Sequence, residues 1–366
     1  MIMDNEIKLK ATGLKREVTI GGAGLTQQAL FAKHLAVMLG SGLALTEALP
    51  VSIESATGRL KSALQDVARA VEAGATLSSA LHDHGHIFPP LLINAVYAGE
   101  RSGNLAVNLA AAARALEKER LLIAKIKGAL IYPATVLVMA LLLGLGLAFF
   151  VLPKIVPLFR GLKVDLPLTT RALIAFADLV DRHGLLLFLA IFGTLAVVII
   201  LARRRFARPF THWLLLHLPG FKPIVRHTNL ARFAGALGLL LKSGVTVNES
   251  LEITERTLSN YYYGTAVHQV ATAVSQGTKL ADNLERFPEL FPTLLTRLVR
   301  VGEISGKFEE TFFYLADFYE GEVDSATKSL STALEPILLL IIGLMVAFLA
   351  LSIITPIYQI TGNINR

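Results

Sequence analysis

Residues 97–105 read YAGERSGNL, and residues 300–308 read RVGEISGKF. The motif Gly-Glu-x-Ser-Gly therefore occurs twice in the chain, 203 positions apart. Because so short a motif can recur by chance, the residues around each copy decide whether it belongs to a larger repeat.

The surrounding residues repeat in the same order. The dipeptide Phe-Pro at 88–89 returns at 291–292, again 203 positions later, while matches nearer the start of each copy are 202 positions apart. A single insertion in about 125 aligned residues indicates an internal duplication. Further matching pairs are Phe31 and Phe233, Leu35 and Leu237, Ser41 and Ser243, Gly42 and Gly244, Glu47 and Glu249, Gly74 and Gly277, and Pro133 and Pro336.

The apolar residues of both copies follow a helical period. Positions 31, 35, 38 and 39 lie on one helix face, and the second copy repeats that face. A Ser-Gly pair follows in each copy and can end the helix, because glycine accepts the left-handed conformation. No alternating strand pattern of useful length occurs. We therefore predict an all-α fold with about six helices in each repeat, the last continuing into a membrane.

The repeated motif itself is predicted to be a tight turn between two helices. In each copy the serine can cap the following helix, and the second glycine allows close packing where that helix begins. Each repeat ends in an apolar segment that is entered through a proline. The residues assigned to these structural features are Gly99, Glu100, Ser102, Gly103, Gly302, Glu303, Ser305, Gly306, Pro133 and Pro336.

Composition indicates a membrane protein. Of the 366 residues, 53% are hydrophobic and 17% are charged, and the mean hydropathy is +0.57. Three stretches carry no charge, at 129–152, 185–202 and 337–355. Each is close to the ~20 residues with which a helix crosses a bilayer. Transporters usually carry ionisable groups at membrane depth, and these stretches have none, so a transporter is the less favoured alternative.

Basic residues predict how the chain is oriented. The net charge is +7, and the basic clusters lie before the first apolar stretch and after the second. The positive-inside rule places both clusters in the cytoplasm, together with the N-terminus. This rule accounts for the basic excess without a nucleic-acid partner, since basic and aromatic residues do not interleave. The polar first residues, which lack an apolar core, predict that no signal peptide is cleaved.

The predicted organisation follows from the repeats and the apolar stretches. It comprises a cytoplasmic tail (1–24), a first cytoplasmic domain (25–128), a first transmembrane helix (129–152), an external loop (153–184), a second transmembrane helix (185–202), a basic cytoplasmic linker (203–227), a second cytoplasmic domain (228–335), a third transmembrane helix (336–355) and an external tail (356–366).

Two patterns that suggest chemistry are weak. Residues 302–307 resemble a P-loop but have one residue too few between the glycines, and Phe308 stands where serine or threonine is needed, so ATP hydrolysis is not expected. The run His-Asp-His-Gly-His at 82–86 has no counterpart in the second repeat and is interpreted as a solvated loop, with fortuitous zinc or nickel binding as the alternative. The absence of cysteine excludes thiolate catalysis and disulfides.

A third pattern suggests a cation site. Glu100 and Asn104 flank the turn of the first repeat, and Glu47 opens a helix that could pack beside it. Such oxygen ligands suit calcium, and helix capping or ion pairing is the alternative role for the two glutamates. The second repeat has Lys307 at the position of Asn104. We therefore expect the first repeat to recruit a cation, and Lys307 to neutralise the equivalent carboxylates, Glu249 and Glu303, in the second.

The paired motifs carry a family resemblance. Two copies of L…SG…L-x-E-A-L…G…FP…AGE-x-SG, each running into an apolar segment, resemble the type II secretion F domain over residues 25–362. The segments VLPKIVPLF and LPLTTRALIAFADLV after the first apolar stretch are similar to the same family. Its members are inner-membrane platforms of type II secretion systems, type IV pili and related filaments.

The resemblance implies a scaffold that is not an enzyme and requires no cofactor. Such platforms couple a cytoplasmic hexameric ATPase to the addition and extraction of pilin or pseudopilin subunits, work with other inner-membrane components, and form homo-oligomers. Calcium is associated with the positions of Glu47, Glu100 and Asn104 in some first F domains. Neither the residues nor the resemblance separates a pilus platform from a secretion platform.

Overall fold

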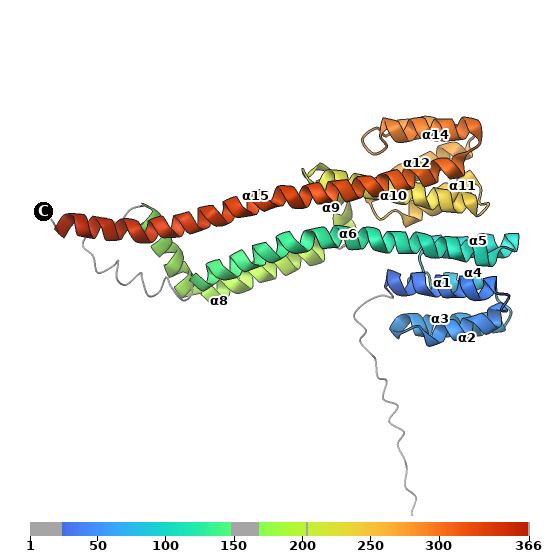
Figure 1. Cartoon of the computed structure of the whole chain (residues 1–366), viewed down its shortest axis with the longest axis horizontal. Coiled ribbons are helices and arrows are strands. Elements are labelled where there is room, and N and C mark those ends of the chain that lie inside the picture. Colours follow the sequence, from blue (N-terminus) through green and yellow to red (C-terminus); the bar gives the residue numbers. More distant parts are fainter. Residues whose placement is uncertain (1–23, 148–167, 203, 365–366) are drawn as a thin grey trace, which may run out of the picture. The chain divides into compact units, whose positions relative to one another are not determined.

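The computed structural model describes residues 24–147, 168–202 and 204–364, and no strand occurs in these ranges (Figure 1). The described residues form two compact units, one before and one after the boundary between residues 117 and 118. The predicted tail before residue 24, the end of the first predicted membrane helix and the start of the external loop lie outside the described residues. The all-α prediction is confirmed.

The first repeat forms six helices within residues 24–147, all of which are described, as predicted. They are α1 (Leu25–Gly40), α2 (Leu45–Glu54), α3 (Gly58–Glu72), α4 (Leu77–Asp83), α5 (Pro90–Ser102) and α6 (Leu105–Gly146). The second repeat has the same order, with α10 (Phe221–Lys242), α11 (Val247–Thr257), α12 (Tyr261–Ser275), α13 (Leu280–Glu285), α14 (Thr293–Ser305) and α15 (Phe308–Ile364).

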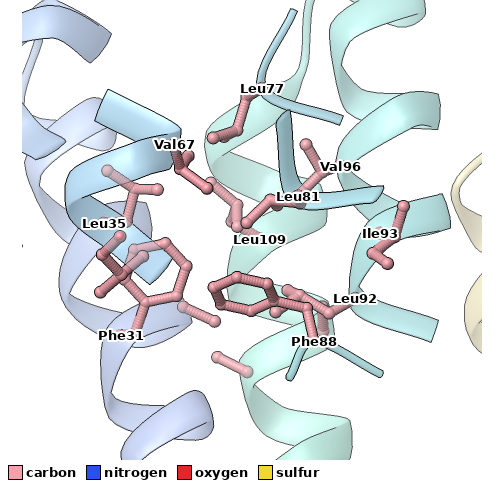
Figure 2. Close-up of a cluster of buried hydrophobic side chains, with 14 of the residues drawn as sticks. Phe31, Leu35, Val67, Leu77, Leu81, Phe88, Leu92, Ile93, Val96 and Leu109 are labelled. Carbon is pink, nitrogen blue, oxygen red and sulfur yellow. The ribbon is translucent and has the colours of Figure 1, made fainter. Parts of the chain in front are cut away.

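The core of the first unit contains two buried phenylalanines that pack against each other (Figure 2). Phe31 on α1 and Phe88, just before α5, are both buried, and their ring centroids lie 5.9 Å apart. Burial of each such side chain contributes about 1.5–3 kcal/mol. Pro89 is the N-cap of α5, so the Phe-Pro dipeptide anchors the core and opens the next helix in one step.

The core of the second unit repeats this arrangement. Phe233 and Phe291, which correspond to Phe31 and Phe88, are buried with ring centroids 5.2 Å apart. Phe312 on α15 packs edge-on against Phe233 at 6.0 Å. The duplication seen in the sequence is therefore a duplication of core packing.

Two predicted connections contain helices. The segment predicted as a basic linker, 203–227, holds the short helix η2 (Arg205–Ala207), the helix α9 (Arg208–His217) and the first residues of α10. Helix α10, the first helix of the second repeat, thus begins at Phe221, inside the segment predicted as a linker. Residues 168–184, predicted as part of an external loop, lie in α8 (Leu168–Ala202). The non-helical φ of −130° at His183 marks a kink just before the second predicted membrane helix.

Two helices in the described part of the chain are long and apolar enough to cross a membrane. These are α6, with 42 residues, and the part of α15 over Phe308–Ser352. Helix α6 contains residues 129–146 of the first predicted transmembrane segment, and α15 contains the third. The last helix of each repeat runs into its apolar part as predicted. The second predicted segment, 185–202, lies within α8, and its role as a span stays a prediction. Residues 356–364, predicted as a tail, continue α15.

Prolines lie inside both long helices, where each leaves a carbonyl without its usual partner. Pro133 in α6 has no N–H, so the carbonyl of Ala129 loses its i+4 bond. Ser331 on α15 donates its hydroxyl to that carbonyl at 3.0 Å. The hydroxyl of a neighbouring helix thus satisfies the acceptor that the proline exposes, which is how helices tolerate proline in an apolar surrounding.

The same arrangement recurs near the far end of α15. Pro356 frees the carbonyl of Ser352, and Thr170 on α8 donates its hydroxyl to that carbonyl at 3.0 Å. Both Thr170 and Ser352 are fully buried. Two proline-freed carbonyls are therefore used to join α15 to α6 and to α8.

The hydrogen bond from Ser331 to Ala129 should stabilise the fold because Pro133 leaves the Ala129 carbonyl without a helical partner. We expect Ser331→Ala to destabilise the detergent-solubilised chain by roughly 0.5–1.5 kcal/mol, the usual range for hydroxyl bonds between membrane helices. In a Pro133→Ala background, residue 133 supplies its own amide to Ala129, so the same substitution should cost less. Thermal unfolding followed by the helical circular dichroism signal measures both costs.

Thr332→Ala is the matched control, because the Thr332 hydroxyl bonds to Lys328 in its own helix at 3.1 Å. It should leave the melting temperature nearly unchanged. If Ser331→Ala destabilised the chain equally in the wild-type and Pro133→Ala backgrounds, the stabilising effect of the Ser331 hydroxyl would not depend on the carbonyl that Pro133 frees.

Candidate functional site

The glutamate of the first Gly-Glu-x-Ser-Gly motif binds the start of another helix. The carboxylate of Glu100, in the last turn of α5, accepts hydrogen bonds from the amide of Leu77 at 2.6 Å and from the amide of Ser78 at 3.2 Å. The Ser78 hydroxyl donates to it as well. Leu77 and Ser78 are the first residues of α4, whose free N–H groups and positive dipole end favour a carboxylate.

The second copy forms the same contact. Glu303 on α14 accepts from the amides of Leu280 at 2.8 Å and Ala281 at 3.2 Å, the first residues of α13. We call each arrangement a glutamate clamp. In the first, Glu100 of α5 binds the start of α4, and in the second, Glu303 of α14 binds the start of α13. Because α4 and α13 have only seven and six residues, neither would be stable alone, and the clamp supplies part of what holds each in place.

The glycines of the motif have different roles from those predicted. Close approach occurs at the first glycine, since a Cβ on Gly99 would lie 2.9 Å from Cα of Leu105 at the start of α6. A Cβ on Gly302 would likewise meet the Thr311 hydroxyl at 2.7 Å. The second glycine ends the helix instead, with φ of +70° at Gly103 and +71° at Gly306.

The prediction that the serines cap the following helix is wrong. Ser102 lies in the last turn of α5 and donates its hydroxyl back to the carbonyl of Ala98 at 2.8 Å. Ser305 donates to the carbonyl of Val301 at 2.8 Å in the same way. In each repeat the helix continues through the serine and ends at the glycine. The serine hydroxyl therefore donates to a carbonyl four residues earlier in the same helix instead of capping the next one.

The predicted cation ligands lie in different surroundings. Glu47 and Asn104 are exposed, whereas Glu100 is occupied by the clamp. No side-chain hydrogen bond or ion pair of Glu47 is formed with the described residues. No cluster of three or more histidine or acidic residues suited to a metal occurs in the described ranges, the histidines at 82–86 included. The predicted calcium ligands include only two carboxylates, so this finding does not test them. The calcium site stays a prediction.

Lys307 does not play the part expected in the second repeat. Its ammonium lies 3.5 Å from Glu310 in the next turn of α15, and both side chains are exposed. Glu303 is satisfied by backbone amides instead. The expectation that Lys307 neutralises Glu303 is therefore wrong, and the motif carboxylates of both repeats are satisfied by helix N-termini.

Ion pairs join α6 to the helices of the second repeat, within the second unit. Arg232 on α10 binds Glu119 on α6 through two hydrogen bonds, one of 3.0 Å from Nε, and donates to Ser259 at 3.1 Å. About a quarter of each of the two paired side chains is exposed. A bidentate, partly buried pair of this kind is the strong form of a salt bridge.

Two lysines add to this junction. Lys118 lies 2.5 Å from Asp317 and 3.4 Å from Glu320, and Lys125 lies 3.3 Å from Asp324. Burial alone would lower the pKa of Lys118, but its hydrogen bond to Asp317 and the charge of Glu320 raise that pKa. The pKa of the Asp324 carboxyl is lowered by hydrogen bonds with Lys328 and Lys125. Both shifts favour the charged forms of Lys118 and Asp324.

An apolar cavity of about 280 Å³ lies beside this junction, between α6, α9, α10, α15 and the turn before α12. Leucine and isoleucine side chains form much of its wall, and no acidic residue occurs among the described residues that line it. His212 reaches it from α9, where burial and then the charge of Arg208 lower the pKa of the imidazole. A neutral His212 accepts from the amide of Tyr261 at 3.0 Å, so it has a structural role.

Sequence reasoning missed the residues of this junction. Arg232 is the one available signal, because it stands between Ala231 and Phe233 in an otherwise apolar stretch and a charge there needs a partner. Nothing in the sequence pairs it with Glu119, which is 113 positions away.

The glutamate clamp predicts that α4 becomes less stable when the Glu100 carboxylate is removed. Replacing Glu100 with glutamine removes the charge that α4 binds, so we expect the amides of Leu77 and Ser78 to open about 1–3 kcal/mol more easily. Hydrogen exchange of the full chain, read by mass spectrometry over α4, measures this as faster exchange. Glu47→Gln is the matched control and should leave α4 unchanged. Equal exchange in both variants would contradict the clamp.

Comparison with known proteins gives the same division of the chain. The family model of type II secretion system protein F matches residues 31–153 and again residues 233–356. These are the two repeats, with the same offset of 202 at the start and 203 at the end.

Relatives match nearly the whole length. The type IV pilus assembly protein PilC of Thermus thermophilus is 38% identical, over 98% of this chain and 90% of its own. PilC of Pseudomonas aeruginosa is 28% identical, over 96% and 95%. The type II secretion system protein F of Aeromonas hydrophila is 30% identical, over 94% and 89%. The two matched segments and these relatives show that the chain belongs to the type II secretion system protein F family.

Proposed function

We propose that this chain is an inner-membrane platform that couples a cytoplasmic assembly ATPase to the polymerisation of pilin or pseudopilin subunits. One observation carries the proposal. The last helix of each F domain runs without a break into an apolar segment, as α6 and α15 do. A force applied to either helical bundle would then reach the membrane along a rigid element.

The proposed topology has three transmembrane segments, 129–152, 185–202 and 336–355, with the N-terminus and both F domains in the cytoplasm. The positive-inside rule supports it, since Lys and Arg gather before the first segment and after the second. Within this topology the 24 residues of α6 before the membrane would extend about 36 Å from it. We propose that other platform proteins and further copies of this chain contact the assembly in the membrane.

The chain is proposed to bind, not to catalyse. Its energy source would be the partner ATPase, because the residues at 302–307 lie at the end of α14 and do not form a phosphate-binding loop between a strand and a helix. Calcium at Glu47, Glu100 and Asn104 remains part of the proposal. The ion would have to share Glu100 with the start of α4.

Pilus assembly is the first candidate, because the relative at 38% identity is named as a type IV pilus assembly protein. Secretion is the second, since the relative at 30% is named as a type II secretion protein. Affinity purification of the intact chain from native membranes, read by mass spectrometry, separates the two. We expect a P-loop assembly ATPase with pilins or with pseudopilins. Recovery of neither, with solute uptake by the purified chain in liposomes, would instead establish a transporter.

The junction between α6 and the second repeat should be needed for coupling rather than for partner binding. Glu119→Arg places two cations together and should cost about 1–3 kcal/mol, because it leaves the partly buried Arg232 unpaired. We expect fewer assembled filaments, counted by electron microscopy, with the ATPase still recovered in the purification.

Adding Arg232→Glu to Glu119→Arg restores opposite charges and should recover much of the assembly. Lys307→Glu is the matched control, because Lys307 is exposed and its ion pair in the described structure is with Glu310, three residues later. A double variant no better than Glu119→Arg alone would refute a role of this pair in coupling.

A further inference from the structure

Helix α9 has an inner face that is bound to the second F domain. The amide of Tyr261 on α12 donates to His212 at 3.0 Å, and the Tyr262 hydroxyl donates to the carbonyl of Pro209 at 3.3 Å. Leu216 packs against the core of the second unit. The orientation of α9 about its own axis is therefore determined, and so is the face that it turns outward.

That outer face carries large apolar side chains. Phe210, Trp213, Leu214 and His217 follow the spacing i, i+3, i+4, i+7, which aligns them along one side of a helix. The exposed fractions of Phe210, Trp213 and Leu214 are 66%, 45% and 43%. Phe206 in η2, just before α9, is 74% exposed. A contiguous apolar surface of this kind marks an interaction site.

Basic residues precede this apolar face in the sequence, and Arg208 lies on the same side of α9 as His212. Arg204 and Arg208 are exposed, and neither forms an ion pair with the described residues. Arg203 and Arg205 add to the same cluster in the sequence. Arginine next to exposed phenylalanine, tryptophan and leucine is the composition of helices that lie in the interface of an anionic bilayer.

The place of α9 in the chain favours the same partner. Helix α8 ends at Ala202, and the apolar stretch 185–202 immediately precedes η2 and α9. If that stretch crosses the bilayer, Arg204 lies one turn or less from its end and Phe206 only slightly further. The apolar face cannot then lie far from the headgroups, which is where tryptophan and arginine are enriched.

We propose that η2 and α9 (residues 205–217) form an interfacial anchor that lies in the headgroup layer of the cytoplasmic leaflet. Phe206, Phe210, Trp213 and Leu214 enter the upper acyl region, and Arg204 and Arg208 bind the phosphates of anionic phospholipids. This inference rests on the proposed topology. Since α9 is bonded to α12 through His212, the anchor fixes the depth of the second F domain at the membrane.

Trp213 provides a direct test, because it is the one tryptophan of the chain. The probe is its fluorescence in the intact, unmodified chain reconstituted into vesicles of phosphatidylglycerol and phosphatidylcholine. Phosphatidylcholine brominated either near the top of its acyl chains or deep within them reports the depth of the ring. We expect an emission maximum shifted to shorter wavelength than in water, strong quenching by the shallow label and weak quenching by the deep one.

A matched control moves the probe to a surface that the proposal places in water. In a Trp213→Phe background, Tyr314→Trp puts the tryptophan on α15 at a position that is 60% exposed, in the second F domain. Its fluorescence should not respond to either brominated lipid. Replacing Arg204 and Arg208 with glutamate should reduce the quenching of Trp213 in vesicles that contain phosphatidylglycerol.

The possible outcomes distinguish a failure of the anchor proposal from a failure of the transmembrane topology on which it rests. Resistance of the reconstituted chain to alkaline extraction shows whether it is integrated. An integrated chain whose Trp213 is unquenched, with emission like that of tryptophan in water, overturns the anchor and leaves the topology standing. Unquenched but blue-shifted emission also overturns it and points to a protein partner. A chain that alkali extracts would refute the topology and the anchor together.

Discussion

Each repeat ends in a helix that must be stable in two surroundings, and this constraint organises the molecule. One part of α6 or α15 packs in a helical bundle, while the other part is apolar and needs a membrane. A break between the two parts would expose backbone groups where the chain leaves water, which costs several kcal/mol for each unpaired group. Two of the three prolines in these helices, Pro133 and Pro356, test this constraint directly, because a hydroxyl from a neighbouring helix donates to the carbonyl that each one frees.

The two repeats use one design with different details. The glutamate clamps on α4 and α13 and the Phe-Phe contacts in both cores show how similar the packing is. The ion pair of Arg232 with Glu119 has no such duplicate among the described contacts of the first repeat. It joins α6, the helix that ends the first repeat, to α10, the helix that opens the second. This junction is therefore a contact in which the two repeats do not correspond.

Much of the fold was predictable because it depends on local patterns. The duplication, the helices of each repeat and the apolar parts of α6 and α15 follow from spacing and composition in the sequence. The clamp of Glu100 on α4 could not be derived, because it depends on a helix start that lies 22–23 residues earlier in the chain. The roles of Ser102 and Gly103 were misassigned because the helix ends one residue later than the motif suggested. Helix α9 was predicted as part of a linker because the arginines at 203–205 and 208 dominate the pattern, although its inner face packs in the second unit.

The most direct test of the central claim is a distance along α6. The chain has no cysteine, so spin labels can be placed at Leu121→Cys and Leu142→Cys alone, both at exposed positions on either side of Pro133. At the rise of an α-helix these backbone positions are about 32 Å apart. The account predicts one narrow distribution near that distance, by double electron–electron resonance in reconstituted vesicles. A broad distribution, or one much shorter, would mean that the helix is broken and cannot transmit force into the membrane.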